Sequence, residues 1–149
     1  MSGEEVLDFL ADEQIVTCAT HGPRGFPHLM PLWYVVRDGR LWAWTFGKSQ
    51  KVKNLQRDPR ATLQVEAGGG DYAQLRGVML ECETVVHTDL DTVLGVGLEV
   101  LARYAPPGSP APGPEVEAMV RKQAEKRVAL EFVEQKRATW DHRKLGGTY

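Results

Sequence analysis

Residues 44–60 read WTFGKSQKVKNLQRDPR, and the rest of the chain is arranged around them. The aromatic start is typical of a strand, and Gly47 interrupts it. Ser49 then stands where the N-cap of a helix belongs, and a helical pattern runs for about two and a half turns before Pro59 ends it. This segment predicts a corner at which a strand turns into a helix.

Positive charge is concentrated at this corner. Residues 48–60 hold five basic side chains and one acidic side chain, in a chain whose formal net charge is -2. The free N–H groups and the dipole of a helix start favour an anion, and Lys48 and Lys51, three residues apart, are expected to share one helical face. Val52 and Leu55 would dock the opposite side of this helix onto the protein. The pattern favours a phosphate site, although a surface helix with solvated lysines has the same composition.

Length and composition restrict the class of protein. A chain of 149 residues is expected to form one domain, 1–149, with a sizeable core. No apolar run approaches the ~20 residues of a membrane span, and the N-terminus is acidic, which predicts a cytoplasmic protein with no membrane partner. The near-neutral charge balance argues against a nucleic-acid partner. Cys18 and Cys82 lie in apolar runs without metal-ligand spacing, so buried free thiols and no metal site are expected.

Hydrophobic spacing and turn residues predict the other elements. Helices are expected at 4–11, 89–104 and 115–126, and strands at 15–20, 26–36, 41–46, 61–67, 72–87 and 127–139. Gly77 is the expected bend of the long strand, Asp38-Gly39 is a hairpin turn, residues 105–113 are a mobile Pro/Gly loop, and residues 140–149 are a polar C-terminal tail. The fold class is mainly β with α connections. Six strands in mostly antiparallel hairpins bury one face best by curling into a barrel.

Several short motifs carry a family resemblance, in order and spacing over most of residues 5–140. They are GFPH at 25–28, PLWY at 31–34, KSQKVKNL at 48–55 and DPR at 58–60. Together they resemble the pyridoxamine 5'-phosphate oxidase-like split β-barrel superfamily, and more narrowly its deazaflavin (coenzyme F420) dependent branch. The resemblance implies a homodimer of six-stranded split barrels, with a flavin or deazaflavin in each of two grooves at the subunit interface.

The same resemblance implies roles for particular residues. The cofactor phosphate would be held by Lys48, Ser49 and Lys51, with Asn54 following on the same helix. The strand at Met30, Pro31, Leu32 and Trp33 would lie along the ring and offer backbone groups to its polar edge. Trp44 and Thr45 would flank the ribityl chain, although aromatic strand residues are more often core or dimer interface. His142 and Arg143 would reach over the groove toward the cofactor tail or the substrate, unless the terminus is disordered.

The implied activity is hydride transfer, by F420, to a conjugated small molecule such as a quinone, an enone or a tetrapyrrole. The cofactor carries this chemistry, so no nucleophile or acid–base dyad is required. No catalytic residue is assigned; His28 is a candidate proton donor or a strand histidine hydrogen-bonded at the barrel mouth. One monophosphate needs fewer cations than this segment holds, which favours a cofactor with a phosphodiester and a polyglutamate tail. The cations are Lys48, Lys51, Lys53, Arg57 and Arg60.

Two other functions are compatible with the same residues. The first keeps the fold and uses flavin mononucleotide (FMN), as an oxidase or flavin reductase. The second is a non-catalytic protein that stores or carries a flavin, a deazaflavin or haem. The chain lacks the Arg-Leu-Ala-Pro ending that helps to bind pyridoxal phosphate in the founding oxidase, which argues against vitamin B6 chemistry.

Overall fold

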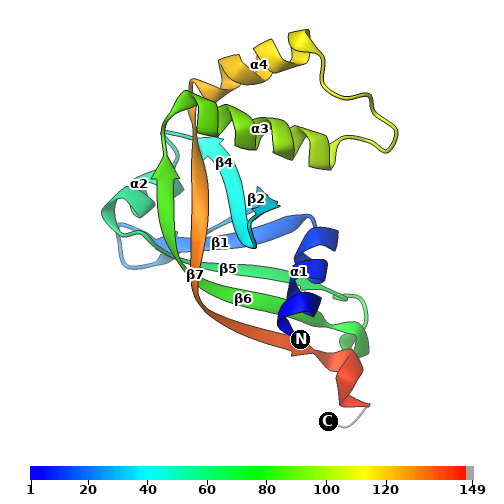
Figure 1. The fold of residues 1–149 in the computed structure, drawn as a ribbon. Coiled ribbons are helices and arrows are strands. Elements are labelled where there is room, and N and C mark those ends of the chain that lie inside the picture. Colours follow the sequence, from blue (N-terminus) through cyan, green and yellow to red (C-terminus); the bar gives the residue numbers. More distant parts are fainter. Residues whose placement is uncertain (147–149) are drawn as a thin grey trace.

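The computed structural model describes residues 1–146, which form one curled antiparallel sheet with helices at its ends and on one face (Figure 1). The seven strands follow the order β2-β1-β5-β6-β7-β4-β3. Their bounds are β1 (Ile15–His21), β2 (Pro27–Trp33), β3 (Val35–Arg37), β4 (Arg40–Phe46), β5 (Arg60–Ala67), β6 (Arg76–His87) and β7 (Arg127–Asp141). The helices are α1 (Gly3–Asp12), α2 (Gln50–Arg57), α3 (Leu90–Tyr104) and α4 (Pro114–Ala124), with single 3-10 turns η1 (Tyr72–Gln74) and η2 (His142–Leu145).

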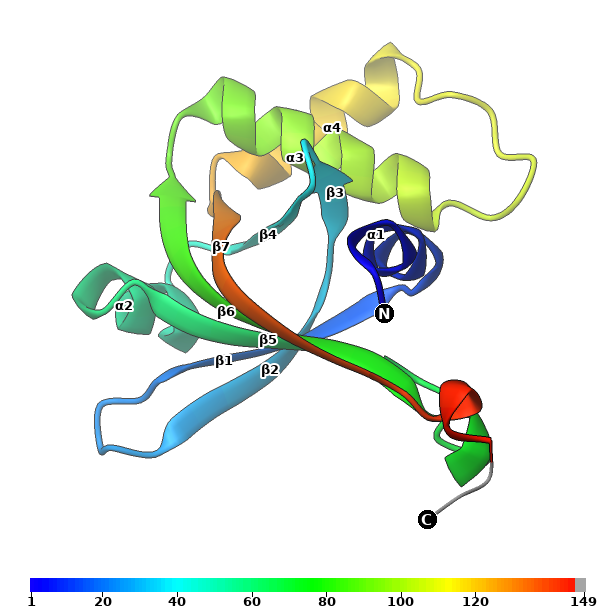
Figure 2. The ribbon, with the colours of Figure 1, turned by 60° about the horizontal axis from the view of Figure 1, so that its bottom comes forward.

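Two layers of apolar side chains hold the fold together. Buried and exposed residues alternate along β1, β4 and β5, so one face of the curled sheet lines a common interior. Phe9 and its neighbours on α1 close one end of this interior. On the outer face of β3, β4 and β7, α3 and α4 form a second cluster around Val96 and Val120. Figure 2 shows both helices lying over this part of the sheet.

The sheet does not close. β2 pairs with β1 and β3 pairs with β4, so β2 and β3 are the two edges. β2 and β4 nevertheless lie near each other without forming a ladder. This opening between β2 and β4 is the split of the barrel, and the mainly β fold with helical connections is confirmed.

The predicted count of six strands is wrong because the run 26–36 is broken at Tyr34. Its side chain is fully buried, with the hydroxyl 2.8 Å from the carbonyl oxygens of Leu10 and Glu13. Its backbone N–H donates to the hydroxyl of Tyr104 at 3.0 Å instead of joining a ladder. These long-range contacts divide one predicted strand into β2 and β3.

The long strand and the C-terminal tail also differ from the prediction. β6 begins at Arg76, after η1, and its irregularity lies at Glu81/Cys82, where Gln135 of β7 has no partner in the ladder. Gly77 is needed for packing, since an added Cβ would come within 2.3 Å of the Trp140 ring. The predicted polar tail begins inside the sheet, because β7 extends to Asp141 and η2 follows it. The last residues of the tail, 147–149, lie outside the described part of the chain.

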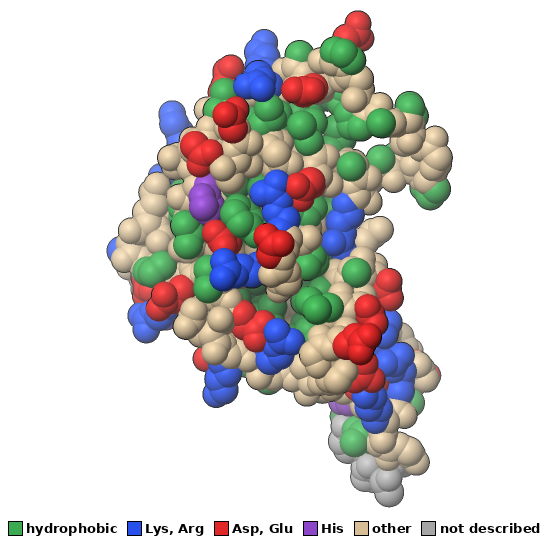
Figure 3. Space-filling model, in the orientation of Figure 1, with side chains coloured by type: hydrophobic (Ala, Val, Ile, Leu, Met, Phe, Trp, Pro, Cys, Tyr) green, Lys and Arg blue, Asp and Glu red, His purple; other side chains and the backbone are tan. Residues whose placement is uncertain are grey.

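The predictions for the two cysteines and for the loop at 105–113 agree with the structure. Both cysteines are free and buried, and burial raises the pKa of each thiol to about 12. Residues 105–113 contain neither helix nor strand. A bilayer-spanning helix would need a longer apolar run than any helix within residues 1–146 provides. Acidic and basic side chains are interspersed over the face shown in Figure 3.

Candidate functional site

The corner between β4 and α2 is fixed by backbone hydrogen bonds. The Gly47 N–H donates to the carbonyl of Lys126 at 2.9 Å, and the Ser49 N–H donates to the carbonyl of Phe46 at 3.0 Å. Ser49 has the extended backbone of an N-cap, and α2 begins at the next residue. Val52 and Leu55 are buried in the main core, as predicted, so the helix start is held rigidly at the end of β4.

Lys51 is the buried cation of this corner. Only 7% of the residue is exposed, and its Nζ donates to the Thr45 hydroxyl at 3.0 Å. Within residues 1–146 no carboxylate pairs with it. Burial lowers the pKa of Lys51, and the nearby charge of Arg127 lowers it further, against an opposing effect of Cys18. A buried lysine without an acidic partner is costly, which is the situation that a bound anion relieves.

Two polar atoms near the split have no hydrogen-bond partner in the described chain. The Ser49 Oγ is buried at the start of α2 and makes no capping bond to its own helix. The Nδ1 of His28, on β2, is also buried and without a partner. Buried polar atoms are nearly always paired, so such atoms indicate a missing ligand. Lys51, Ser49 and the first N–H groups of α2 fit a phosphate group.

The predicted alignment of Lys48 with Lys51 is wrong. α2 begins only at Gln50, so Lys48 precedes the helix and is exposed, whereas Lys51 turns inward. Arg57 and Arg60 have other partners. Arg57 donates to the carbonyl of His21 at 2.5 Å, and Arg60 forms an ion pair with Asp58 at 2.6 Å. The excess of cations inferred from the sequence is therefore smaller in the folded protein.

Asn54 joins α2 to the sheet. It is fully buried, its Nδ2 donates to the Thr20 hydroxyl at 3.0 Å, and its Oδ1 accepts from Gln50 at 2.8 Å. These bonds hold α2 against β1 beside Lys51. Direct contact between Asn54 and a cofactor stays a prediction.

The predicted ring-binding strand is an edge of the sheet. The side chains of Met30 and Leu32 lie on the same face as the buried partners Cys18 and Val16 on β1, whereas Pro31 and Trp33 point to the outer face. The second edge of β2 has no ladder partner within residues 1–146. Its backbone groups are available along the split, as the predicted contact with a planar ring requires.

The side chains of Thr45, Trp44 and Trp33, three residues predicted to contact the cofactor, lie in different parts of the fold. Thr45 faces the interior and holds Lys51, but Trp44 faces α3, where it packs against Gly97 and under the guanidinium of Arg127. Trp33 is 55% exposed and stacks on Tyr104 with ring centroids 4.4 Å apart. Trp44 and Thr45 therefore point to opposite faces of β4.

His142 and Arg143 lie at the far end of the sheet from α2 (Figure 1). The His142 N–H donates to the carbonyl of Leu75 at 2.9 Å. Arg143 forms an ion pair with Asp141 at 2.7 Å, and this hydrogen bonding lowers the pKa of Asp141 to about 2. Within one chain these two residues are not brought together with Lys51.

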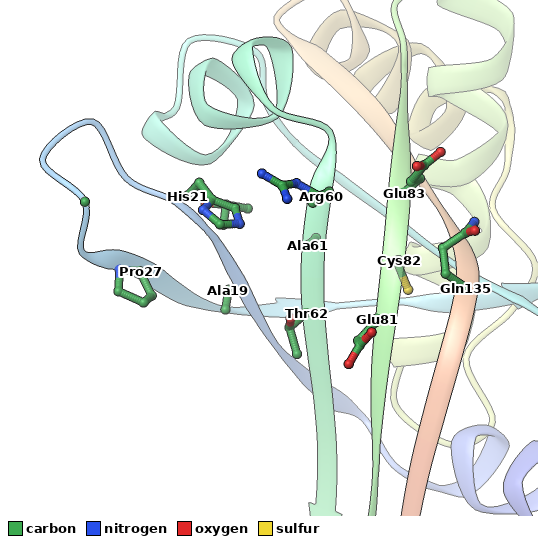
Figure 4. A pocket seen from close by; sticks show the side chains of 12 residues that line it. Ala19, His21, Pro27, Arg60, Ala61, Thr62, Glu81, Cys82, Glu83 and Gln135 are labelled. Atoms are coloured by element: carbon green, nitrogen blue, oxygen red, sulfur yellow. The ribbon is translucent and has the colours of Figure 1, made fainter.

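A cavity of about 520 Å³ lies across β1, β5, β6 and β7 (Figure 4). Arg60 lines it, together with Gly25 and Pro27 of the motif at 25–28, but Lys51, Ser49 and the other residues predicted to contact the cofactor do not. Glu81 and Glu83 stand on one side of this cavity and His21 and Arg60 on the other. Two carboxylates make it a poor site for an anionic cofactor, so the α2 corner is the better phosphate site.

Arg127 and Tyr104 are the residues near the site that sequence reasoning missed. Arg127 begins β7 and reaches the corner because β7 pairs with β4, with Phe46 opposite Arg127. Tyr104 ends α3 and reaches Trp33 across the fold. Both lie more than 65 residues away from their contacts in the sequence, and no local pattern marks either one.

A family model described as pyridoxamine 5'-phosphate oxidase matches residues 2–138. The chain belongs to the pyridoxamine 5'-phosphate oxidase family. The crystal structure of a conserved hypothetical protein from Mycobacterium tuberculosis is similar over all of this chain and 90% of that one, with 40% identity and a TM-score of 0.89.

More distant members of this fold differ in what they bind. A structure titled F420 reductase matches 88% of this chain and 94% of its own, with 18% identity and a TM-score of 0.63. HutZ, a haem storage protein from Vibrio cholerae, matches 93% of this chain and 92% of its own, with 11% identity and a TM-score of 0.68. At these identities the likeness shows the fold alone. No curated protein matches the chain significantly.

Proposed function

We propose that this family member binds a flavin-type cofactor in the split between β2 and β4, with the cofactor phosphate at the start of α2. One observation carries the proposal: Lys51 is buried at that corner without a carboxylate partner in the described chain. The unpaired Oγ of Ser49 supplies a second group for the same anion. Charge-assisted hydrogen bonds of this kind are among the strong ones in proteins.

The cofactor proposed is F420, used to transfer a hydride to a conjugated small molecule of the quinone, enone or tetrapyrrole type. When bound, the deazaflavin supplies the hydride. The chain would hold the phosphate with Lys51 and Ser49, support the ring along the free edge of β2, and present His28 as a proton donor. The motifs at 25–28 and 48–60 support F420, but the cation count no longer does, since Arg57 and Arg60 are engaged elsewhere.

We also propose a homodimer, in which a second copy covers the outer face of β1 and β2. Ile15, Leu29 and Trp33 are each more than half exposed there, and Ile15 lies directly opposite Trp33 in the register. Their neighbours on this face, Thr17 and Pro31, carry no charge. An uncharged apolar face of this kind marks an interaction surface. His142 and Arg143 would reach a cofactor only across such a dimer.

Cofactor titration tests the binding proposal. Purified protein would be titrated with F420 and with FMN, followed by fluorescence at physiological salt. Micromolar or tighter binding of F420, weakened in Lys51→Ala and retained in the exposed control Lys53→Ala, is the expected result. Preference for FMN would favour an oxidase or flavin reductase, and binding of neither would contradict the phosphate site.

Turnover distinguishes a reductase from a carrier. Oxidation of reduced F420 would be followed with a panel of quinones, enones and tetrapyrroles. Tight binding without turnover of any of them would favour storage or carriage.

The oligomeric state tests the proposed dimer. Light scattering after gel filtration would give the mass of the protein in solution, and Leu29→Glu is expected to yield a monomer. A dimer that survives this change would contradict the proposed interface.

A further inference from the structure

Arg127 is held above the ring of Trp44, at the point where the corner begins. Its guanidinium carbon lies 4.4 Å from the ring centroid, a cation–π contact. In the register, Phe46 lies opposite Arg127, and the next residue, Gly47, donates to the carbonyl of Lys126. The start of β7 is thus tied to the start of the corner that leads to α2.

Arg127 also lacks a counterion in the described chain. Within residues 1–146 no acidic side chain forms an ion pair with it, whereas other arginines of the sheet have such a partner, including Arg37, Arg40, Arg60 and Arg137. Its charge adds a small lowering of the pKa of Lys51 to the larger effect of burial. Two cations that each lack a carboxylate partner are both stabilised by an anion that binds within reach of them.

The position of Trp44 depends on a glycine of α3. A Cβ added at Gly97 would lie 2.6 Å from Cζ3 and 2.8 Å from Cε3 of the Trp44 ring. The indole is rigid and packed between helix and sheet, so it cannot give way cheaply. Gly97 therefore sets where Trp44 lies, and Trp44 sets where the guanidinium of Arg127 lies.

We infer that Arg127 is a second cationic ligand of the phosphate group and that Trp44, seated on Gly97, is its positioning residue. This inference rests on the proposed phosphate site. It changes the predicted role of Trp44, which would act on the phosphate through Arg127 instead of flanking the ribityl chain. A guanidinium offers two parallel N–H groups to a phosphate, so it adds geometric selection to the point charge of Lys51.

The test compares ligands with and without the phosphate. Affinities of wild type, Arg127→Ala and Arg127→Lys would be measured for FMN against riboflavin, and for F420 against its phosphate-free deazaflavin. Arg127→Ala is expected to weaken the phosphate-bearing ligand by about 10- to 100-fold, with little change for the phosphate-free one. Arg127→Lys is expected to recover only part of that loss. The neighbouring exposed residue provides the control, since Lys126→Ala removes the same charge and is expected to have little effect.

Trp44→Leu and Gly97→Ala test the positioning role. Both are expected to weaken only the phosphate-bearing ligand, by less than Arg127→Ala does, with melting temperatures measured alongside to confirm folding. An Arg127→Ala affinity equal to that of Lys126→Ala would overturn the inference while leaving the phosphate site intact. If wild type binds no cofactor, the proposed function fails, and titration with inorganic phosphate still decides whether Arg127 binds an anion.

Discussion

Two charged clusters of this protein are built in opposite ways. On the outer face of the sheet, the carboxylate of Glu131 lies 2.9 Å from His87 and 2.5 Å from Arg40, and His87 stacks on Trp42. At the α2 corner, neither Lys51 nor Arg127 forms an ion pair with a carboxylate within residues 1–146, and the Oγ of Ser49 is unpaired. The first cluster is complete within the chain and the second is not. An incomplete cluster is kept at a cost to stability and indicates a ligand.

The largest effect is expected from Lys51→Met. This change removes the buried charge but keeps an apolar side chain of similar length, so cofactor affinity should fall by about 10- to 100-fold. The free protein should be as stable as wild type or more so, because the desolvation cost of the ammonium group is gone. Fluorescence titration and urea unfolding would measure the two effects. If Lys51→Met were less stable than wild type, Lys51 would stabilise the folded chain, in contradiction to the expected desolvation cost.

The complete cluster should respond in the reverse way. Glu131→Gln leaves His87 and Arg40 without their shared carboxylate, and a loss of about 1–3 kcal/mol in unfolding free energy is expected. Cofactor affinity should not change, because the cluster lies outside the split. Urea denaturation and the same titration would test this. A fall in affinity as large as that of Lys51→Met would remove the distinction between the clusters.

Acid should weaken the complete cluster specifically. Burial alone would raise the pKa of Glu131, but hydrogen bonds from His87 and Arg40 outweigh it, so the net pKa is below the ordinary 4.5. A carboxylate with a depressed folded-state pKa stabilises the protein above its unfolded value, and this stability is lost as the pH falls. The gap in stability between wild type and Glu131→Gln should therefore narrow below about pH 4.5. Unfolding curves between pH 3 and 7 would show it.

Raising the pH should stabilise the folded protein through the incomplete cluster. The folded-state pKa of Lys51 is lowered from 10.5, so between that lowered pKa and 10.5 the unfolded chain binds more protons than the folded one. Wild-type stability should rise with pH across this range relative to Lys51→Met. A constant difference between the two proteins from pH 7 to 10 would contradict the burial of a charged ammonium group.

The smallest expected effect compares two serine N-caps. Ser2 accepts from the Glu5 N–H at 3.2 Å in a complete capping box on α1, whereas Ser49 caps nothing on α2. Ser2→Ala should cost about 1 kcal/mol of stability and leave binding alone. Ser49→Ala should leave stability nearly unchanged and lower cofactor affinity by about 2- to 10-fold. Equal losses of stability in Ser2→Ala and Ser49→Ala would mean that the Ser49 side chain caps α2 in solution.

Predictions that depended on neighbouring residues were mostly confirmed. The N-cap position of Ser49, the docking of Val52 and Leu55 and the helix expected at 115–126 agree with the structure, because such signals act within one or two turns. Wrong predictions involved distant contacts. Tyr34 breaks a strand because it bonds to α1 and α3, and Gly77 makes room for Trp140.

Sequence alone was sufficient for the family, the curled β-sheet and the basic corner, since local patterns and short motifs express all three. It was not sufficient to tell which cations of that corner are free. Arg60 is neutralised by Asp58 and Arg57 is held by the carbonyl of His21, whereas Lys51 is buried because α2 turns it toward Thr45. Arg127 joins it only because β7 pairs with β4 across more than 80 residues of chain. Charge is a property of composition, but its neutralisation depends on tertiary distances.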